Sequence, residues 1–220
     1  MILNKYKNIL FDLDGTLTDP KVGITKSVDY ALQKMGIIDN DLESLKKFIG
    51  TPLTKSFNEY YGFNFQEVEK AIMYYREYFS VTGIYENIIY PGIEYILKEL
   101  KNRKIKIIVA TSKPLIYAKK ITDHFNITKY FTNIEGSQLD GKLSDKTELI
   151  AYIMQKYNLL PGNTIMVGDR EHDIIGAENN EIDSIGVGYG YGSKEELTYS
   201  GANYYVNTVN NLTGLLLDED

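Results

Sequence analysis

The sequence predicts an α/β fold in which helices cover both faces of a doubly wound parallel sheet. Four short runs are almost continuously apolar, a pattern typical of strands that are buried on both faces. Helical patterns separate most of these runs, and such alternation indicates right-handed crossovers between parallel strands. The predicted strands cover residues 8–11, 105–110, 164–167 and 183–187.

Each predicted strand stops at polar residues or at glycine. Asp12 follows the first strand, Thr111 the second, Gly168 the third and Gly188 the fourth. The carboxyl ends of parallel strands meet at one edge of a sheet, and doubly wound folds bind their ligands at that edge. We therefore expect the ligand site among these strand ends.

The helices of the predicted core follow from apolar residues at helical spacing. They cover residues 91–103, 114–125 and 145–157, and two of the three start at or next to proline, which suits the first turn of a helix.

One region breaks the alternation, because only helical patterns occur between residues 24 and 85. A strand-free block after the first strand predicts a small helical cap, with Gly23 and Gly83 among the glycines that could act as its hinges. The expected helices cover residues 24–35, 41–49, 53–60 and 66–79. The predicted domains are an α/β core of residues 1–20 and 86–220 and a cap of residues 21–85.

Composition excludes several classes of function. A formal net charge of -6 without a long basic run argues against a nucleic-acid partner. The chain has no cysteine, which excludes thiolate catalysis, and 2 histidines leave little for a zinc site or a serine–histidine triad. No stretch approaches the roughly 18 apolar residues that span a bilayer. We therefore expect a soluble cytoplasmic protein without a membrane or nucleic-acid partner.

Acidic residues gather at two of the strand ends. Asp12 and Asp14 follow the first strand, and Asp169 and Asp173 follow the third. Nearby carboxylates repel each other in a partly dry crevice, so they require a cation or a shared proton, and oxygen ligands suit Mg²⁺. The alternatives are an aspartate-rich turn and acids that stabilise a helix start. The latter alternative accounts for Glu171, which we leave outside the predicted site.

Donors for a phosphate group follow the second strand. Thr111 and Ser112 offer hydroxyl groups, and the helix that opens at Pro114 offers backbone N–H groups. Lys146 adds a cation at the start of the helix before the third strand. The alternative for Lys146 is an ordinary solvated lysine.

The order of these pieces resembles the haloacid dehalogenase superfamily. They are Asp-x-Asp-Gly-Thr, then Thr-Ser-Lys, then a lone lysine, then Gly-Asp-x-x-x-Asp. The resemblance covers essentially the whole chain and extends to the branch of phosphoglycolate phosphatases and β-phosphoglucomutases. It implies a Rossmann-like core with a cap, and a Mg²⁺-dependent phosphatase with an aspartyl-phosphate intermediate.

The resemblance also implies roles for single residues. Asp12 would be the nucleophile and Asp14 the general acid and base. Asp12, the carbonyl group of Asp14 and Asp169 would hold the metal ion, and Asp173 would support that set. Because Asp14 is present, phosphoryl transfer is favoured over C–halogen hydrolysis, for which the family keeps a single aspartate in this motif.

The phosphate oxygens would be bound by Thr111, Ser112 and Lys146. The family lysine usually precedes proline or a similar helix-start residue, whereas Lys146 follows Ser144-Asp145, so Lys142 is a competing candidate. The expected helix start beside Asp145 favours Lys146.

The expected substrate is a small phosphorylated metabolite, such as phosphoglycolate or a nucleoside monophosphate, and the expected assembly is a monomer or homodimer. The alternatives are a phosphosugar mutase, a phosphoprotein phosphatase and a phosphate-binding protein without activity. The cap is expected to decide the substrate through Gly50, Thr51, Thr54 and Lys55, which follow its second predicted helix. Lys55 would then bind a second anionic group, unless it is an ordinary exposed lysine.

Overall fold

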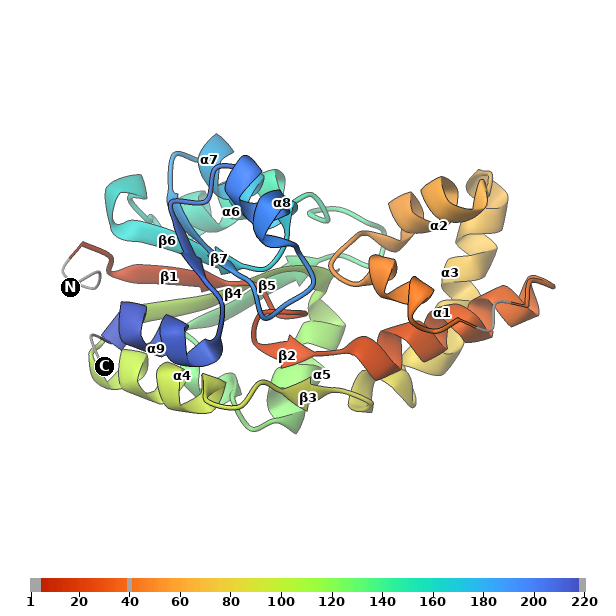
Figure 1. Ribbon diagram of the computed structural model, residues 1–220, viewed down its shortest axis with the longest axis horizontal. Helices are drawn as coiled ribbons and strands as arrows, with labels where there is room; N and C mark the ends of the chain where they lie inside the picture. Colours follow the sequence, from red (N-terminus) through yellow and green to blue (C-terminus); the bar gives the residue numbers. More distant parts are fainter. Residues whose placement is uncertain (1–4, 39–40, 218–220) are drawn as a thin grey trace. The chain divides into compact units, whose positions relative to one another are not determined.

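The computed structural model describes residues 5–38 and 41–217. The chain divides into two compact units, one made of Met1–Asp19 with Ile89–Asp220 and the other of Pro20–Ile88 (Figure 1). The predicted boundaries were 20/21 and 85/86. Residues 1–4 and 218–220 of the predicted core, and residues 39–40 of the predicted cap, lie outside the described residues.

The first unit is built on a six-stranded parallel sheet in the order β5-β4-β1-β6-β7-β8, which confirms the predicted fold class. Strand β1 lies at the centre, and Asn8 is in register with Lys106 on one side and Thr164 on the other. The strands are β1 (Asn8–Phe11), β4 (Lys106–Pro114), β5 (Asn133–Ser137), β6 (Thr164–Gly168), β7 (Asp183–Val187) and β8 (Tyr204–Val206).

Helices cover both faces of this sheet. Helices α6 (Lys146–Lys156) and α7 (Glu171–Asn179) pack on one face, and α4 (Ile93–Asn102) and α9 (Val209–Leu217) on the other (Figure 1). The core beneath α6 joins strand residues to helix residues, namely Leu10, Ile108, Met166, Leu149, Ile150 and Ile153, all with 0% exposure. Helices α5 (Leu115–His124) and α8 (Lys194–Tyr199) complete the unit. No helix in the described ranges has the length and apolar character that a membrane span requires.

Three strands of the six-stranded sheet differ from the sequence prediction. Strand β4 was expected to end at Ala110 but continues to Pro114 through a register irregularity, with Pro114 pairing with Ser137. A side-chain Cβ at Gly136 would lie 2.5 Å from the carbonyl oxygen of Lys113, so glycine permits this close pairing. The edge strands β5 and β8 were missed, because a strand at a sheet edge lacks the long apolar run of a central strand.

The second unit is helical, with α1 (Lys21–Lys34), α2 (Leu53–Tyr61) and α3 (Phe65–Phe79). Helix α3 starts at a capping box, in which Asn64 accepts from the backbone of Glu67 and Glu67 accepts from that of Asn64. The expected helix 41–49 is a shorter 3₁₀ helix, η2 (Ser44–Phe48), and a second one is η3 (Gly83–Tyr85). The two-residue strands β2 (Thr18–Asp19) and β3 (Ile88–Ile89) pair where the chain passes between the units.

Gly23 and Gly83, expected as hinges, lie against each other inside the helical unit. A Cβ at Gly23 would lie 1.9 Å from the carbonyl oxygen of Gly83. We expect Gly23→Ala to lower the free energy of unfolding by about 1–3 kcal/mol, because a backbone atom cannot move aside for the new methyl group. Gly162→Ala is the control, because no atom lies within 4 Å of its added Cβ. Equal urea midpoints for the two variants would show that this contact is not tight.

Candidate active site

Three carboxylates meet at the carboxyl edge of the sheet. Asp12 follows β1, Asp169 follows β6, and Asp173 lies in the first turn of α7. Their exposures are 4%, 0% and 1%. One oxygen of each lies within 4.8 Å of the others. The parallel sheet thus brings Asp12 and Asp169, which are 157 positions apart, into a single buried acidic cluster.

Lys146 supplies the cation of this cluster. It opens α6, where the Asp145 side chain accepts a hydrogen bond of 3.0 Å from the backbone of Glu148. Its Nζ lies 2.9 Å from Asp12 Oδ1 and 2.8 Å from Asp173 Oδ1, and it donates to the carbonyl oxygen of Ala110 at 2.8 Å. The competing Lys142 is instead exposed and pairs with Asp140 at 3.3 Å. Of the two lysines, the structure brings Lys146 to the acidic residues.

The buried cluster holds more acidic groups than basic ones. Burial alone would lower the pKa of Lys146, but the carboxylates of Asp12 and Asp173 raise it overall, so the ammonium group stays charged. Burial raises the pKa of Asp173 to about 6, and burial followed by repulsion from Asp12 raises that of Asp169 well above its usual value. One lysine does not balance three carboxylates. Buried oxygen ligands without sulfur or imidazole fit a hard divalent cation such as Mg²⁺.

Asp14 lies next to the cluster but pairs with a different lysine. Its side-chain Oδ2 lies 2.7 Å from Nζ of Lys113, and both side chains are less than 10% exposed. Within the described part of the chain, Asp14 Oδ1 has no hydrogen-bond partner. Burial raises the pKa of Asp14, and the charge of Lys113 opposes that rise. Sequence analysis did not assign Lys113 to the site, although its place directly after Thr111-Ser112 was an available signal.

The predicted phosphate-binding hydroxyls lie at the irregular end of β4. Thr111 is buried, and its Oγ1 accepts a hydrogen bond of 3.3 Å from the backbone of Lys113. Ser112 is half-buried, and its carbonyl oxygen accepts a bond of 2.8 Å from the hydroxyl group of Ser137 on β5. The edge strand β5 therefore supports the segment on which the predicted phosphate ligands lie.

Two backbone segments, one containing Gly15 and the other Gly190, lie very close to the Asp169 side chain and donate hydrogen bonds to it. Thr16 donates from its hydroxyl group to Asp169 Oδ1 at 3.1 Å, and the backbone of Tyr191 donates to Oδ2 at 2.8 Å. A Cβ at Gly15 would lie 2.2 Å from Asp169 Oδ2, and one at Gly190 would lie 2.3 Å from Asp169 Cβ. Thr16 and Tyr191 were not predicted as site residues. The alternation Gly-Tyr-Gly-Tyr-Gly after β7 was the signal that could have indicated the second contact.

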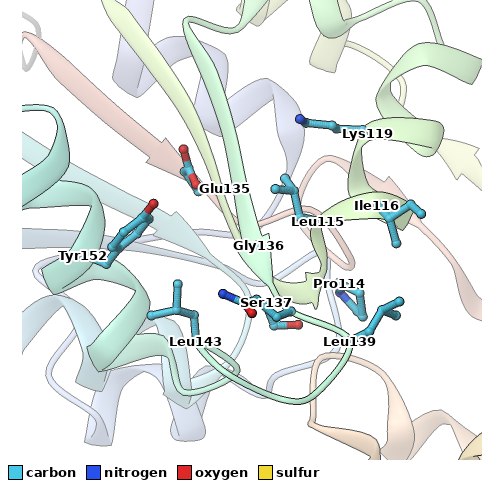
Figure 2. A pocket seen from close by; sticks show the side chains of 11 residues that line it. Pro114, Leu115, Ile116, Lys119, Glu135, Gly136, Ser137, Leu139, Leu143 and Tyr152 are labelled. Atoms are coloured by element: carbon cyan, nitrogen blue, oxygen red, sulfur yellow. The ribbon is translucent and has the colours of Figure 1, made fainter.

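A separate hollow of about 440 Å³ lies behind the end of β4. Figure 2 shows its lining side chains, among them Leu115, Leu139 and Leu143. It borders Pro114 and Ser137, but none of the four aspartates of the site lines it. The acidic cluster, and not this hollow, has the groups that chemistry on a phosphate ester requires.

The predicted specificity residues belong to the helical unit. Gly50 has a φ of 80°, which favours glycine, and Thr51 is half-buried beside it. Thr54 and Lys55 are exposed in the first turn of α2. The Nζ of Lys55 lies 3.8 Å from Glu59 on the same helix, a contact typical of an ordinary exposed lysine.

Comparison with known proteins matches this arrangement to a family. The family model for haloacid dehalogenase-like hydrolases matches residues 9–187. A 5'-nucleotidase of Pseudomonas aeruginosa is 46% identical over 91% of this chain and 91% of its own length. The tyrosine-protein kinase PtkA of Mycobacterium tuberculosis is 35% identical over 84% of this chain and 62% of its own length.

The fold gives the same result. The crystal structure of a predicted phosphatase from Clostridium acetobutylicum superposes with a TM-score of 0.94 at 51% identity, covering 98% of this chain and 100% of that one. Three of the four motifs of the sequence lie at the ends of strands of this fold, and the lone lysine, Lys146, opens α6. The chain therefore belongs to the haloacid dehalogenase-like hydrolase family and is a phosphatase.

Proposed function

We propose that this phosphatase hydrolyses small phosphomonoesters with the help of Mg²⁺, through an aspartyl-phosphate on Asp12. The observation that supports this most is the buried Asp12 at the end of β1, held at Oδ1 by Lys146 and close to Asp169 and Asp173. The relative named as a 5'-nucleotidase favours nucleoside monophosphates as the first substrates to test. Phosphoglycolate is the second candidate.

Asp12 acts as the nucleophile in the first step. A carboxylate oxygen of Asp12 forms a bond to phosphorus as the ester P–O bond breaks, and the alcohol leaves with a proton from Asp14. Lys146 fixes the Asp12 carboxylate by the ion pair at Oδ1. In the second step water attacks phosphorus, its proton passes to Asp14, and the bond from phosphorus to Asp12 breaks.

Asp14 is suited to carry this proton. Its carboxyl group is buried, and burial favours the protonated form that the first step requires. Its Oδ1 has no hydrogen-bond partner among the residues that the structure describes, which leaves one oxygen for the leaving group. Lys113 holds the other oxygen and so orients the carboxyl group.

The remaining residues would bind the negatively charged phosphoryl group and the metal ion. Thr111, Ser112 and Lys146 would hold the phosphoryl oxygens. Asp12, the carbonyl oxygen of Asp14 and Asp169 would hold Mg²⁺, with Asp173 supporting them. When bound, Mg²⁺ supplies positive charge that offsets repulsion between Asp12 and the phosphate dianion.

A phosphosugar mutase remains the alternative within the family, because the same motifs serve both reactions. Release of inorganic phosphate in equal amount to the alcohol separates hydrolysis from transfer to a second hydroxyl group. This chain covers only 62% of the length of the tyrosine-protein kinase PtkA, so we do not carry the kinase reaction over to it. Hydrolysis is therefore the reaction that we propose.

The helical unit is proposed to act as the cap that selects substrates. Its chain enters just after β2, a few residues after the turn of Asp12 and Asp14, and leaves at β3, which pairs with β2. An insert at this place is suited to cover the catalytic edge and exclude water from it. Gly50, Thr51, Thr54 and Lys55 are the residues that we expect to contact the substrate.

The metal site can be tested without turnover. We expect Mg²⁺ to raise the Tm, because a cation relieves repulsion among buried carboxylates. At a hundred times the Kd, the stabilisation is about 2.7 kcal/mol. Asp169→Asn should lose most of this shift, and NaCl at matched ionic strength is the control. An equal shift in the variant, or with NaCl, would contradict the assignment of Asp169.

The nucleophile is tested by Asp12→Asn in an assay of phosphate release from nucleoside monophosphates, phosphoglycolate and hexose phosphates. An amide is a poor nucleophile, so we expect kcat to fall by more than about a thousandfold. Asp140→Asn is the matched control, since Asp140 is an exposed aspartate whose partner is Lys142. Circular dichroism checks that both variants are folded. Normal turnover by Asp12→Asn would refute the mechanism.

Specificity is tested by replacing Thr51, Thr54 and Lys55 together with alanine. We expect KM and the ranking of nucleotide substrates to change, while hydrolysis of p-nitrophenyl phosphate changes little, because a minimal ester needs few cap contacts. Lys70→Ala, an exposed lysine of α3 in the same unit, is the control. An unchanged substrate ranking in the triple variant would place specificity elsewhere.

A further inference from the structure

Residues 188–192, Gly-Tyr-Gly-Tyr-Gly, connect β7 to α8 (Figure 1). They form a clamp around Asp169. The backbone of Tyr191 donates to the Asp169 carboxylate at 2.8 Å, and that of Gly192 donates to the Asp169 carbonyl oxygen at 3.0 Å. A Cβ at Gly190 would lie 2.3 Å from Asp169 Cβ, and one at Gly192 would lie 2.1 Å from Asp169 O. Only glycine at these two positions lets the segment approach so closely.

The two tyrosines anchor the clamp to the segment that follows Asp14. The hydroxyl group of Tyr191 donates to Asp19 Oδ1, and that of Tyr189 donates to the carbonyl oxygen of Thr16 at 3.0 Å. Burial and the bond to Asp19 raise the pKa of Tyr191, so its hydroxyl group remains a donor at neutral pH. The glycines leave the segment flexible in isolation, and the tyrosine anchors restrict it.

We propose that Tyr191 is a positioning residue for the metal site: its hydroxyl group, bound to Asp19, fixes the backbone N–H that orients the Asp169 carboxylate. The inference rests on the proposed function, in which Asp169 is a metal ligand. Groups that orient a metal ligand change metal affinity by roughly 10- to 100-fold when they are lost. A tyrosine that only stabilises the fold would lower the Tm and leave metal affinity unchanged.

The test is a titration with Mn²⁺, a hard ion that oxygen ligands bind and whose free form is measured by electron paramagnetic resonance. Tyr191→Phe keeps the backbone N–H and removes the hydroxyl group, and we expect roughly tenfold weaker binding. Asp19→Ala removes the same hydrogen bond from its other end and should have a similar effect. The double variant should bind no more weakly than either single variant, because both lose one shared interaction. Tyr199→Phe is the control, since Tyr199 is 90% exposed.

Unchanged Mn²⁺ affinity in folded Tyr191→Phe, or independent losses that multiply in the double variant, would overturn the inference. A lowered Tm with unchanged affinity would also overturn it, because it shows a purely structural role. If one single variant fails to fold, the other still tests the same hydrogen bond. A wild-type protein that does not bind Mn²⁺, or an Asp169→Asn variant that binds it normally, would instead overturn the proposed metal site.

Discussion

Repulsion among buried carboxylates is the constraint on which the rest of this site depends. Asp12, Asp169 and Asp173 are each less than 5% exposed, and Lys146 is the cation that contacts two of them. Charges so poorly hydrated are costly unless they are paired, and removal of one partner of a buried pair destabilises a protein by roughly 3–5 kcal/mol. The excess negative charge favours a divalent cation, and under the proposed function that cation would prepare the site for a phosphate dianion.

The parallel sheet makes this concentration of charge possible. Strands β1 and β6 are neighbours, so Asp12 and Asp169 emerge at the same edge. Glycines then allow backbone segments to enclose Asp169 at distances that no side chain would tolerate. Rigid strands set the positions of the acids, while the turns that follow them supply hydrogen bonds. This division explains why the chemistry lies on short loops at the ends of a well-packed core.

The central strands and the acids could be predicted from the sequence, because buried parallel strands are continuously apolar and their polar ends are conspicuous. Lys146 could be placed because Asp145 marks a helix start. The edge strands β5 and β8 could not, since they lack that apolar pattern. Local signals mark Lys113 and Tyr191, but the residues that they contact are 99 and 22 positions away, and a local pattern does not identify such distant partners. The roles of the cap residues stay predictions.

The central claim is a phosphoryl group bound covalently to Asp12, and trapping it is the most direct measurement. The wild-type enzyme would be mixed with a ³²P-labelled nucleoside monophosphate and quenched in acid within one turnover. We predict protein-bound label that hydroxylamine releases, as expected of an acyl-phosphate, and that maps to the peptide containing Asp12. Release of phosphate without any protein-bound label, or label on another residue, would contradict the account.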